Sequence, residues 1–149
     1  MARLFLLALI LVPALAQGVR TGITPGEMEA LLKAGPYRYD RGEEGGRVYF
    51  HLRLAGLRAV LFLQDCREGS CESLLLYAGF STDNPPSLER VNEWNREKRF
   101  SRAYLDEEGD PVLEADLDLA GGVADGAIRA FLDLLEENLR AFAAWIGWE

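Results

Sequence analysis

Residues 47–54 alternate strictly between two kinds of side chain, and this pattern constrains the fold more than any other feature of the sequence. One set of alternate positions is apolar: Val48, Phe50, Leu52 and Leu54. The other set is polar or amphipathic: Arg47, Tyr49, His51 and Arg53. Successive side chains of a β-strand point to opposite faces, so a period of two predicts a half-buried strand.

Further strands are predicted on both sides of this segment. Residues 37–41 form a short strand followed by a turn over 42–46, and residues 73–80 form a strong strand. Residues 57–64 are apolar on both faces at their centre, which is typical of a central strand. Two later strands, over 100–105 and 112–119, are joined by a hairpin at 106–110 with Gly109 in the left-handed position.

Three helices are predicted around these strands. The first has Thr24 as N-cap, Pro25 at the first helical position and Glu27 closing a capping box, and it ends at Gly35-Pro36. The second is capped by Ser87 and has Leu88, Val91 and Trp94 on one side. The last runs from about 124 to 145 and carries two apolar stripes.

The order of elements indicates an α+β fold. Runs of strands between helices predict an antiparallel sheet of about five to six strands flanked by three helices, in the order α-β-β-β-(β)-α-β-β-α and covered mostly on one face. The chain has 149 residues, of which 49% are hydrophobic, which fits a single domain with its own core over residues 17–149.

Residues 1–16 have the pattern of a signal peptide. Arg3 gives a positive start, an apolar run extends from Leu4 to Val12, and Ala14-Leu15-Ala16 provides small residues before a cut after Ala16. The run is shorter than the roughly 20 residues that a spanning helix needs, so we expect cleavage rather than membrane anchoring. The sequence therefore predicts a periplasmic or secreted protein.

Cys66 and Cys71 lie in a short polar link between two apolar runs. In an oxidising compartment, two nearby cysteines at the mouth of a hairpin favour a structural disulfide. A redox-active pair is a weaker interpretation because the spacing is not C-x-x-C, and a zinc site would need two further ligands.

No catalytic or cofactor-binding set emerges from the sequence. His51 is the only histidine, and the alternation places it on a polar strand face. Asp106, Glu108 and Asp110 have the first spacings of a calcium loop, but Pro111 stands where glycine is required. The chain carries 16 Lys+Arg against 24 Asp+Glu, for a formal charge of −8, so nucleic acid is not an expected partner.

Two surfaces are candidates for binding a partner. Glu114, Asp116 and Asp118 share one strand face, which is either a solvated ladder paired with Arg47, Arg53 and Arg102 or a surface for a basic partner. The last helix has a second stripe formed by Leu134, Ala141, Trp145 and Trp148, which favours core packing, a homodimer or a bound peptide.

The stretch from Val91 to Phe100, V-N-E-W-N-R-E-K-R-F, and its continuation to Leu119 closely resemble the YbjN family of proposed bacterial sensory transduction regulators. Weaker similarity extends from Ile23 through the Asp65-Cys66 turn to Phe80. The resemblance implies a fold like the type III secretion chaperones, often dimeric, without catalytic residues or a cofactor. Many relatives look cytoplasmic, whereas this chain carries an export signal.

These observations lead to one main functional hypothesis and two alternatives. We expect an exported, non-enzymatic module that binds a protein or peptide on its sheet face or last helix, with candidate contacts at Trp94, Asn95, Arg99, Trp145 and Trp148. The alternatives are an envelope hydrolase or metal-dependent enzyme that uses the acidic hairpin Asp106–Asp110, and a thiol-exchange protein that uses Cys66 and Cys71.

Overall fold

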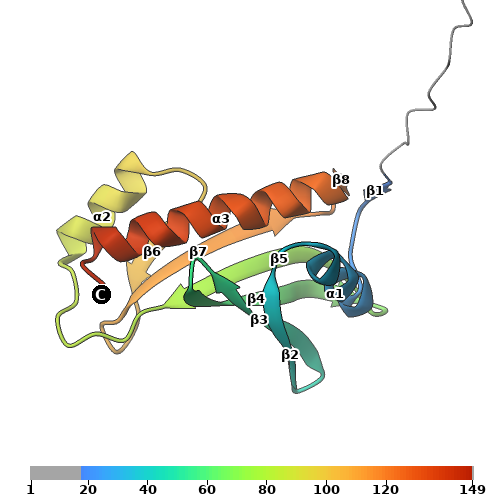
Figure 1. Ribbon diagram of the computed structural model, residues 1–149, viewed down its shortest axis with the longest axis horizontal. Coiled ribbons are helices and arrows are strands. Elements are labelled where there is room, and N and C mark those ends of the chain that lie inside the picture. The colour runs from blue at the N-terminus through green and yellow to red at the C-terminus, as the bar shows by residue number, and fades with distance from the viewer. Residues whose placement is uncertain (1–17, 149) are drawn as a thin grey trace, which may run out of the picture.

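A computed structural model describes residues 18–148, so the predicted signal peptide lies outside the described residues. Figure 1 shows the arrangement of the elements. In chain order they are β1 (Val19–Arg20), α1 (Pro25–Ala34), β2 (Arg38–Glu44), β3 (Arg47–Leu54), β4 (Leu57–Arg67), β5 (Ser70–Gly79), α2 (Leu88–Glu97), β6 (Arg102–Leu105), β7 (Pro111–Asp118), β8 (Val123–Ala124) and α3 (Asp125–Trp145).

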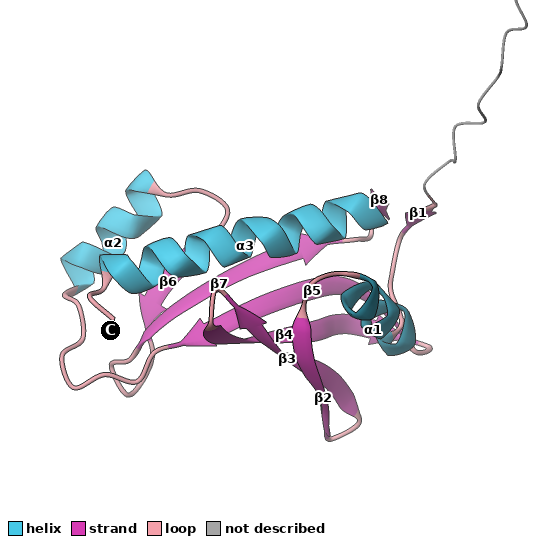
Figure 2. Ribbon diagram, viewed as in Figure 1, coloured by secondary structure: helices cyan, strands magenta, loops and turns pink. Residues whose placement is uncertain are grey.

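Six strands form one antiparallel sheet in the order β2-β3-β4-β5-β7-β6. The predicted α+β class is therefore confirmed, and the doubly apolar strand β4 lies inside the sheet, as its sequence indicates. The helices and the sheet form separate layers, with α3 running along one side of the strands (Figure 2).

One face of the sheet forms the core with the three helices. The apolar set of β3 lies on this face, where Phe50, Leu52 and Leu54 are at most 1% exposed. The buried helix residues in the same cluster are Met28, Leu31, Leu32, Val91, Trp94, Ile128, Leu132, Leu135, Leu139, Phe142 and Ala143. The first stripe of α3 therefore packs on the sheet, which is the half-covered arrangement that the alternation predicts.

The start of α1 confirms the predicted capping box. The Glu27 backbone N–H donates to Thr24 Oγ1 at 3.2 Å, and the Thr24 N–H donates to Glu27 Oε2 at 2.8 Å. These reciprocal bonds satisfy two donors that a helix N-terminus otherwise leaves without partners. Ile23 and Met28, on either side of the cap, are both fully buried and fix the entry of the helix into the core.

The turn predicted over 42–46 is wrong, because β2 continues to Glu44 and only Gly45 and Gly46 form the turn. Both glycines have positive φ, as a two-residue hairpin turn requires. Gly42 is instead a strand residue opposite Tyr49. The Tyr49 ring lies directly over Gly42, and a Cβ atom at position 42 would clash with it. The close aromatic neighbour explains why glycine occupies this strand position.

Two short pairings that the sequence did not indicate hold the N-terminal segment in place. β1 pairs with β8 just before α3, and Arg20 binds Asp125 in the first turn of that helix. Ile23 exchanges two backbone hydrogen bonds of 2.9 Å with Cys71. This segment is thus tied both to the start of α3 and to the end of the sheet.

Two expectations about apolar residues near α2 are also wrong. Leu88 is 73% exposed and does not belong to the buried side formed by Val91 and Trp94. Phe100 was predicted as the start of a strand, but β6 begins at Arg102 and Phe100 is 61% exposed with a positive φ. Within residues 18–148, no helix combines the length and apolar character needed to cross a membrane.

Candidate functional site: the open face of the sheet

The second face of the six-stranded sheet carries a group of apolar side chains outside the core cluster. We call this surface the open face. Five half-buried residues at its centre form what we call the apolar stripe: Tyr49, Val60, Phe62, Leu75 and Tyr77. They are neighbours by register, since Phe62 lies opposite both Tyr49 and Leu75, and Val60 lies opposite Tyr77. In the described part of the chain the helices pack their buried residues against the other face, so the stripe has no helix above it.

A row of three arginines crosses the open face beside the stripe. Arg38 lies opposite Arg53, which in turn lies opposite Arg58, on strands β2, β3 and β4. All three are exposed, and none of them forms an ion pair with a carboxylate among residues 18–148. Like charges directly opposite one another on neighbouring strands destabilise a sheet. The row is therefore a group of exposed like charges on neighbouring strands, with Asp40 on the same face beside it.

The opposite side of the open face is acidic. Glu114, Asp116 and Asp118 lie on it along β7, as the sequence indicates. Arg102 on the neighbouring strand β6 binds both Glu114 and Asp116. The expectation that Arg47 and Arg53 also pair with these carboxylates is wrong, because β4 and β5 separate β3 from β7.

Two tyrosines border the acidic side, and their environment raises both phenol pKa values. Burial is the largest cause at Tyr104, followed by its hydrogen bond to Glu114 Oε1 at 2.8 Å, and together they raise its pKa to about 12. Burial is also the main cause of the raised pKa of Tyr77, with nearby carboxylates contributing. Both side chains therefore remain neutral hydrogen-bonding groups at physiological pH.

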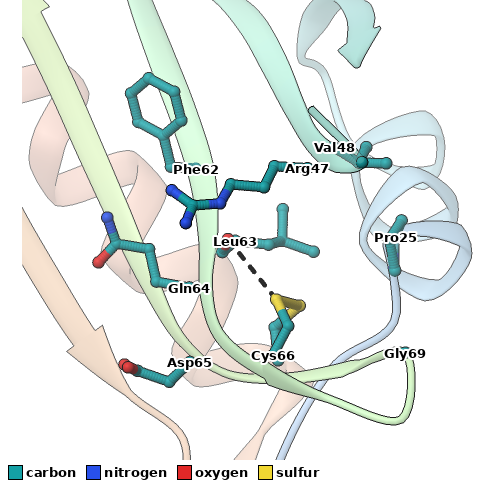
Figure 3. A pocket seen from close by; sticks show the side chains of 11 residues that line it. Pro25, Arg47, Val48, Phe62, Leu63, Gln64, Asp65, Cys66 and Gly69 are labelled. Carbon is teal, nitrogen blue, oxygen red and sulfur yellow. Dashed lines mark hydrogen bonds between the residues drawn. A yellow bond between two sulfur atoms is a disulfide. The ribbon is translucent and has the colours of Figure 1, made fainter. Parts of the chain in front are cut away.

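A cavity of about 630 Å³ opens at one end of the open face. The pairing of β3 with β4 ends at Tyr49 and Phe62, so Arg47 and Val48 have no partner on β4 and a wedge is left between the strands. Its walls include Pro25 of α1, Leu63 and both cysteines. Figure 3 shows Arg47 extending toward Phe62 and Gln64, with the disulfide at the lower end of the view. The lining combines apolar side chains with the Arg47 guanidinium, the Gln64 amide and the Asp65 carboxylate, which suits an amphipathic side chain or ligand.

The disulfide predicted from the sequence is present. Cys66 and Cys71 are directly opposite each other near the end of the β4–β5 hairpin, and Cys71 is 3% exposed. The hairpin turns at Glu68 and Gly69, which both have positive φ. The strands reach closer to this turn than the sequence indicated, so the bond joins two strands rather than the ends of a loop.

The candidate acid and base groups do not converge. His51 is exposed on the open face, with its ring 5.2 Å from that of Tyr49. In the acidic hairpin, Asp106 Oδ1 accepts the backbone N–H groups of Glu108 and Asp110, so it braces the turn. Asp110 accepts the Ser81 hydroxyl and the Thr82 N–H. Among residues 18–148, no three His, Cys, Asp or Glu side chains are placed to hold a metal ion.

The aromatic residues predicted as partner contacts pack largely within the chain. Trp94 is fully buried, so it offers no surface to a partner and its prediction as a contact is wrong. Trp145 lies under the Arg90 guanidinium, 3.5 Å from the ring centroid, and donates its N–H to the Arg90 carbonyl. Trp148 packs edge-on against Phe80 and is 37% exposed.

The two polar residues predicted as contacts differ from each other. Asn95 binds both backbone groups of Ala103, at 2.8 and 2.9 Å, and so takes the place of a neighbouring strand at the edge of β6. Arg99 is exposed, with its guanidinium 4.8 Å from the centroid of the Phe100 ring. Of the five predicted contacts, Asn95, Arg99 and Trp148 are exposed, Trp145 is half-buried and Trp94 is buried.

The apolar stripe is a candidate site that the sequence pattern alone did not predict. The signal was present in Val60-Leu61-Phe62 and in Leu74 to Ala78, which are apolar on both faces. We interpreted this pattern only as the mark of a central strand. When helices cover only one face of a sheet, apolar side chains on the other face stay exposed to solvent. This can be recognised only once the arrangement of helices and strands is known.

The family comparison matches residues 24–148 to the YbjN family model, described as "Putative bacterial sensory transduction regulator". No curated protein matches the chain. The matched range includes α1, all six strands of the main sheet, α2 and α3.

Proposed function

The chain belongs to the YbjN family, and from this premise we propose that it is a non-enzymatic regulator that acts by binding a protein or peptide on its open face. The observation that carries the proposal is the apolar stripe, which has no covering helix in the described fold. Contiguous apolar surface of this kind marks interaction sites on soluble proteins. The open face is a better site than the last helix, because Trp145 and Trp148 are engaged within the chain.

The charged residues on either side of the apolar stripe would make partner binding selective. The arginine row lies on one side and the carboxylates of β7 on the other, so a partner must match two signs of charge in one orientation. Such charge patterns suppress wrong partners and fix the register of right ones. This is the behaviour that a regulator needs.

We place the protein outside the cytoplasm, in the periplasm or secreted. Two features support this: the pattern of a signal peptide over residues 1–16, with cleavage after Ala16, and a disulfide between Cys66 and Cys71. Disulfides persist in oxidising compartments and are rare in the cytosol.

Site-specific photocrosslinking in the producing cells tests the proposal. A photoreactive amino acid replaces Leu75 at the centre of the stripe, and a control protein carries it at Arg140, which is exposed on α3. We expect protein adducts from position 75 and not from position 140, and cell fractionation of the adducts locates the protein. Equal labelling from the two positions, or none from position 75, would refute binding at the open face.

The enzyme alternative predicts a different dependence on the acidic hairpin. Changing Asp106, Glu108 and Asp110 to the matching amides would abolish activity on some substrate if these carboxylates were catalytic. A binding protein should instead show altered affinity and a weaker dependence on salt. The hydrogen bonds of Asp106 and Asp110 brace the turn, so their presence is accounted for without a catalytic role.

A further inference from the structure

We propose that the cavity of about 630 Å³ between β3 and β4 binds a small amphipathic carboxylate, in which an apolar chain ends in one carboxylate group. We call this cavity the wedge pocket. The proposal does not depend on the proposed function, because the ligand is a small molecule and its site lies beside the apolar stripe rather than on it. Three observations carry it: the separation of the two strands, the apolar depth of the cavity, and the charges at its mouth.

Both walls of the wedge pocket are strands that stay paired on their other sides. β3 and β4 pair with each other only as far as Tyr49 and Phe62. Beyond that point β3 remains paired with β2 to its first residue, Arg47, and β4 remains paired with β5 to its last residue, Arg67. The opening is therefore built into the folded sheet, as is usual for small-molecule sites, which are largely formed before the ligand binds.

The depth of the wedge pocket is apolar. Val48 and Leu63 belong to the strand faces that pack on the core, and Leu63 is itself buried. Pro25 at the start of α1 and the disulfide of Cys66 and Cys71 complete this part of the lining. None of these side chains carries a hydroxyl, amide or charged group, so an alkyl chain suits this part better than peptide units, whose amides would need partners. The volume lies within the range of about 300–1,000 Å³ that is typical of small-molecule sites.

The mouth of the wedge pocket carries a cation. Arg47 is exposed and forms no ion pair among residues 18–148, not even with Glu44, which lies opposite it on β2. Its side chain extends toward Phe62 and Gln64 (Figure 3). A guanidinium binds a carboxylate through two parallel hydrogen bonds, and the Gln64 amide is a further donor in the same lining. A carboxylate is therefore the head group that this mouth favours.

Asp65 limits the ligand to a single negative charge. It also lines the wedge pocket, and its Oδ2 accepts the Ser73 hydroxyl at 2.6 Å, a bond that holds the carboxylate beside β5 and leaves its charge in place. A ligand with two anionic groups would meet this like charge. One cation and one carboxylate in the same lining therefore favour a monocarboxylate.

Calorimetric titration of the protein purified from the producing cells tests the class of ligand. Decanoate is the probe, and we expect saturable binding at concentrations below those at which it forms micelles. Decanol keeps the chain and lacks the carboxylate. It should bind about tenfold or more weakly, because the charge-assisted hydrogen bonds to Arg47 are lost.

Variants at the mouth locate the carboxylate. Arg47→Gln should weaken decanoate binding about tenfold or more and leave decanol binding unchanged, a difference that a folding defect would not produce. Arg53→Gln is the matched control, because Arg53 lies on the same face of β3 and outside the lining of the cavity, and it should change neither affinity. Asp65→Asn should strengthen decanoate binding about threefold, because it removes a like charge.

Nuclear magnetic resonance and a filling variant locate the alkyl chain. Decanoate should shift the amide signals of Val48, Leu63 and Cys71 and leave those of α2 in place. Val48→Phe places a larger side chain in the cavity, so it should weaken the binding of decanoate and decanol alike. Circular dichroism checks that this variant is folded.

Four outcomes would overturn the proposal: no saturable binding of decanoate, equal affinity for decanoate and decanol, equal effects of Arg47→Gln and Arg53→Gln, or amide shifts only outside the wedge pocket. Tighter binding of acetyl-leucyl-leucine than of decanoate would also overturn it, because the site would then fit the C-terminus of a peptide. Photocrosslinking from position 75 reports on the proposed function separately. Protein adducts at that position, without decanoate binding, would leave the proposed function standing and remove the ligand site alone.

Discussion

Arg102 and Glu114 face each other across β6 and β7, with Arg102 Nη2 2.6 Å from Glu114 Oε2. Glu114 is 8% exposed, and no other charged residue of the described chain is buried. Arg102 also reaches Asp116 at 3.2 Å, while Tyr104 donates to the second oxygen of Glu114. A buried carboxylate is tolerated only when its hydrogen bonds are satisfied, and these two residues of β6 satisfy it.

Removing Arg102 should therefore destabilise the fold. Arg102→Ala leaves the Glu114 carboxylate with the Tyr104 hydroxyl alone, and we expect a loss of about 1–2 kcal/mol in the free energy of unfolding, because Arg102 itself is largely exposed. Urea denaturation measures the change. Arg129→Ala, an exposed position on α3, is the control and should stay within about 0.5 kcal/mol of the parent. Equal stability of the two variants would contradict the assigned role.

Local sequence rules predicted most of the fold. The Thr24–Glu27 capping box, the alternation of β3 and the hairpin at Gly109 each depend on neighbouring residues, and each is confirmed. The predicted turn at 42–46 failed because Gly42 is required by Tyr49 on another strand. A turn prediction that uses only neighbouring residues in the sequence does not take contacts between strands into account.

The candidate site was harder to predict than the fold. The carboxylates of β7 were identified from spacing, and the disulfide from the short separation of its cysteines together with the predicted export signal. The arginine row was not, because Arg38, Arg53 and Arg58 come together only when three strands align in register. Trp94 was mistaken for a contact because the sequence does not show that Phe142 and Trp145 enclose it.

Trp94 should behave as a core residue. Trp94→Ala removes a ring that packs 5.0 Å from Phe142, and we expect it to lower the free energy of unfolding by about 3–5 kcal/mol. Leu88→Ala, six residues earlier on the same helix but exposed, should change stability by less than about 0.5 kcal/mol. Chemical denaturation monitored by circular dichroism compares them. A small effect of Trp94→Ala would restore Trp94 as a surface contact.

The disulfide should contribute to stability rather than to chemistry. Closing the loop from Cys66 to Cys71 removes denatured-state entropy worth about 2 kcal/mol in the chain-entropy model. Reduction of the parent should lower the free energy of unfolding by about that amount, whereas the double variant Cys66→Ser with Cys71→Ser should not respond to reductant. If the single variant Cys66→Ser abolishes partner capture without unfolding the protein, thiol exchange becomes the better hypothesis.

Tyr104 should make the fold sensitive to alkaline pH. Burial and the Glu114 hydrogen bond raise its pKa to about 12, whereas an unfolded tyrosine has a pKa of about 10. A raised pKa in the folded state means that this stabilisation is complete below about pH 10 and is lost as the pH rises through about 12. In Tyr104→Phe, the free energy of unfolding should fall less steeply over this pH range. The ultraviolet titration of tyrosine ionisation should lose one group that ionises near pH 12. It should also cost about 1 kcal/mol at neutral pH, because Glu114 loses a hydrogen bond. If the titration curve of Tyr104→Phe still shows the same number of tyrosines that ionise near pH 12, the alkaline step belongs to another tyrosine.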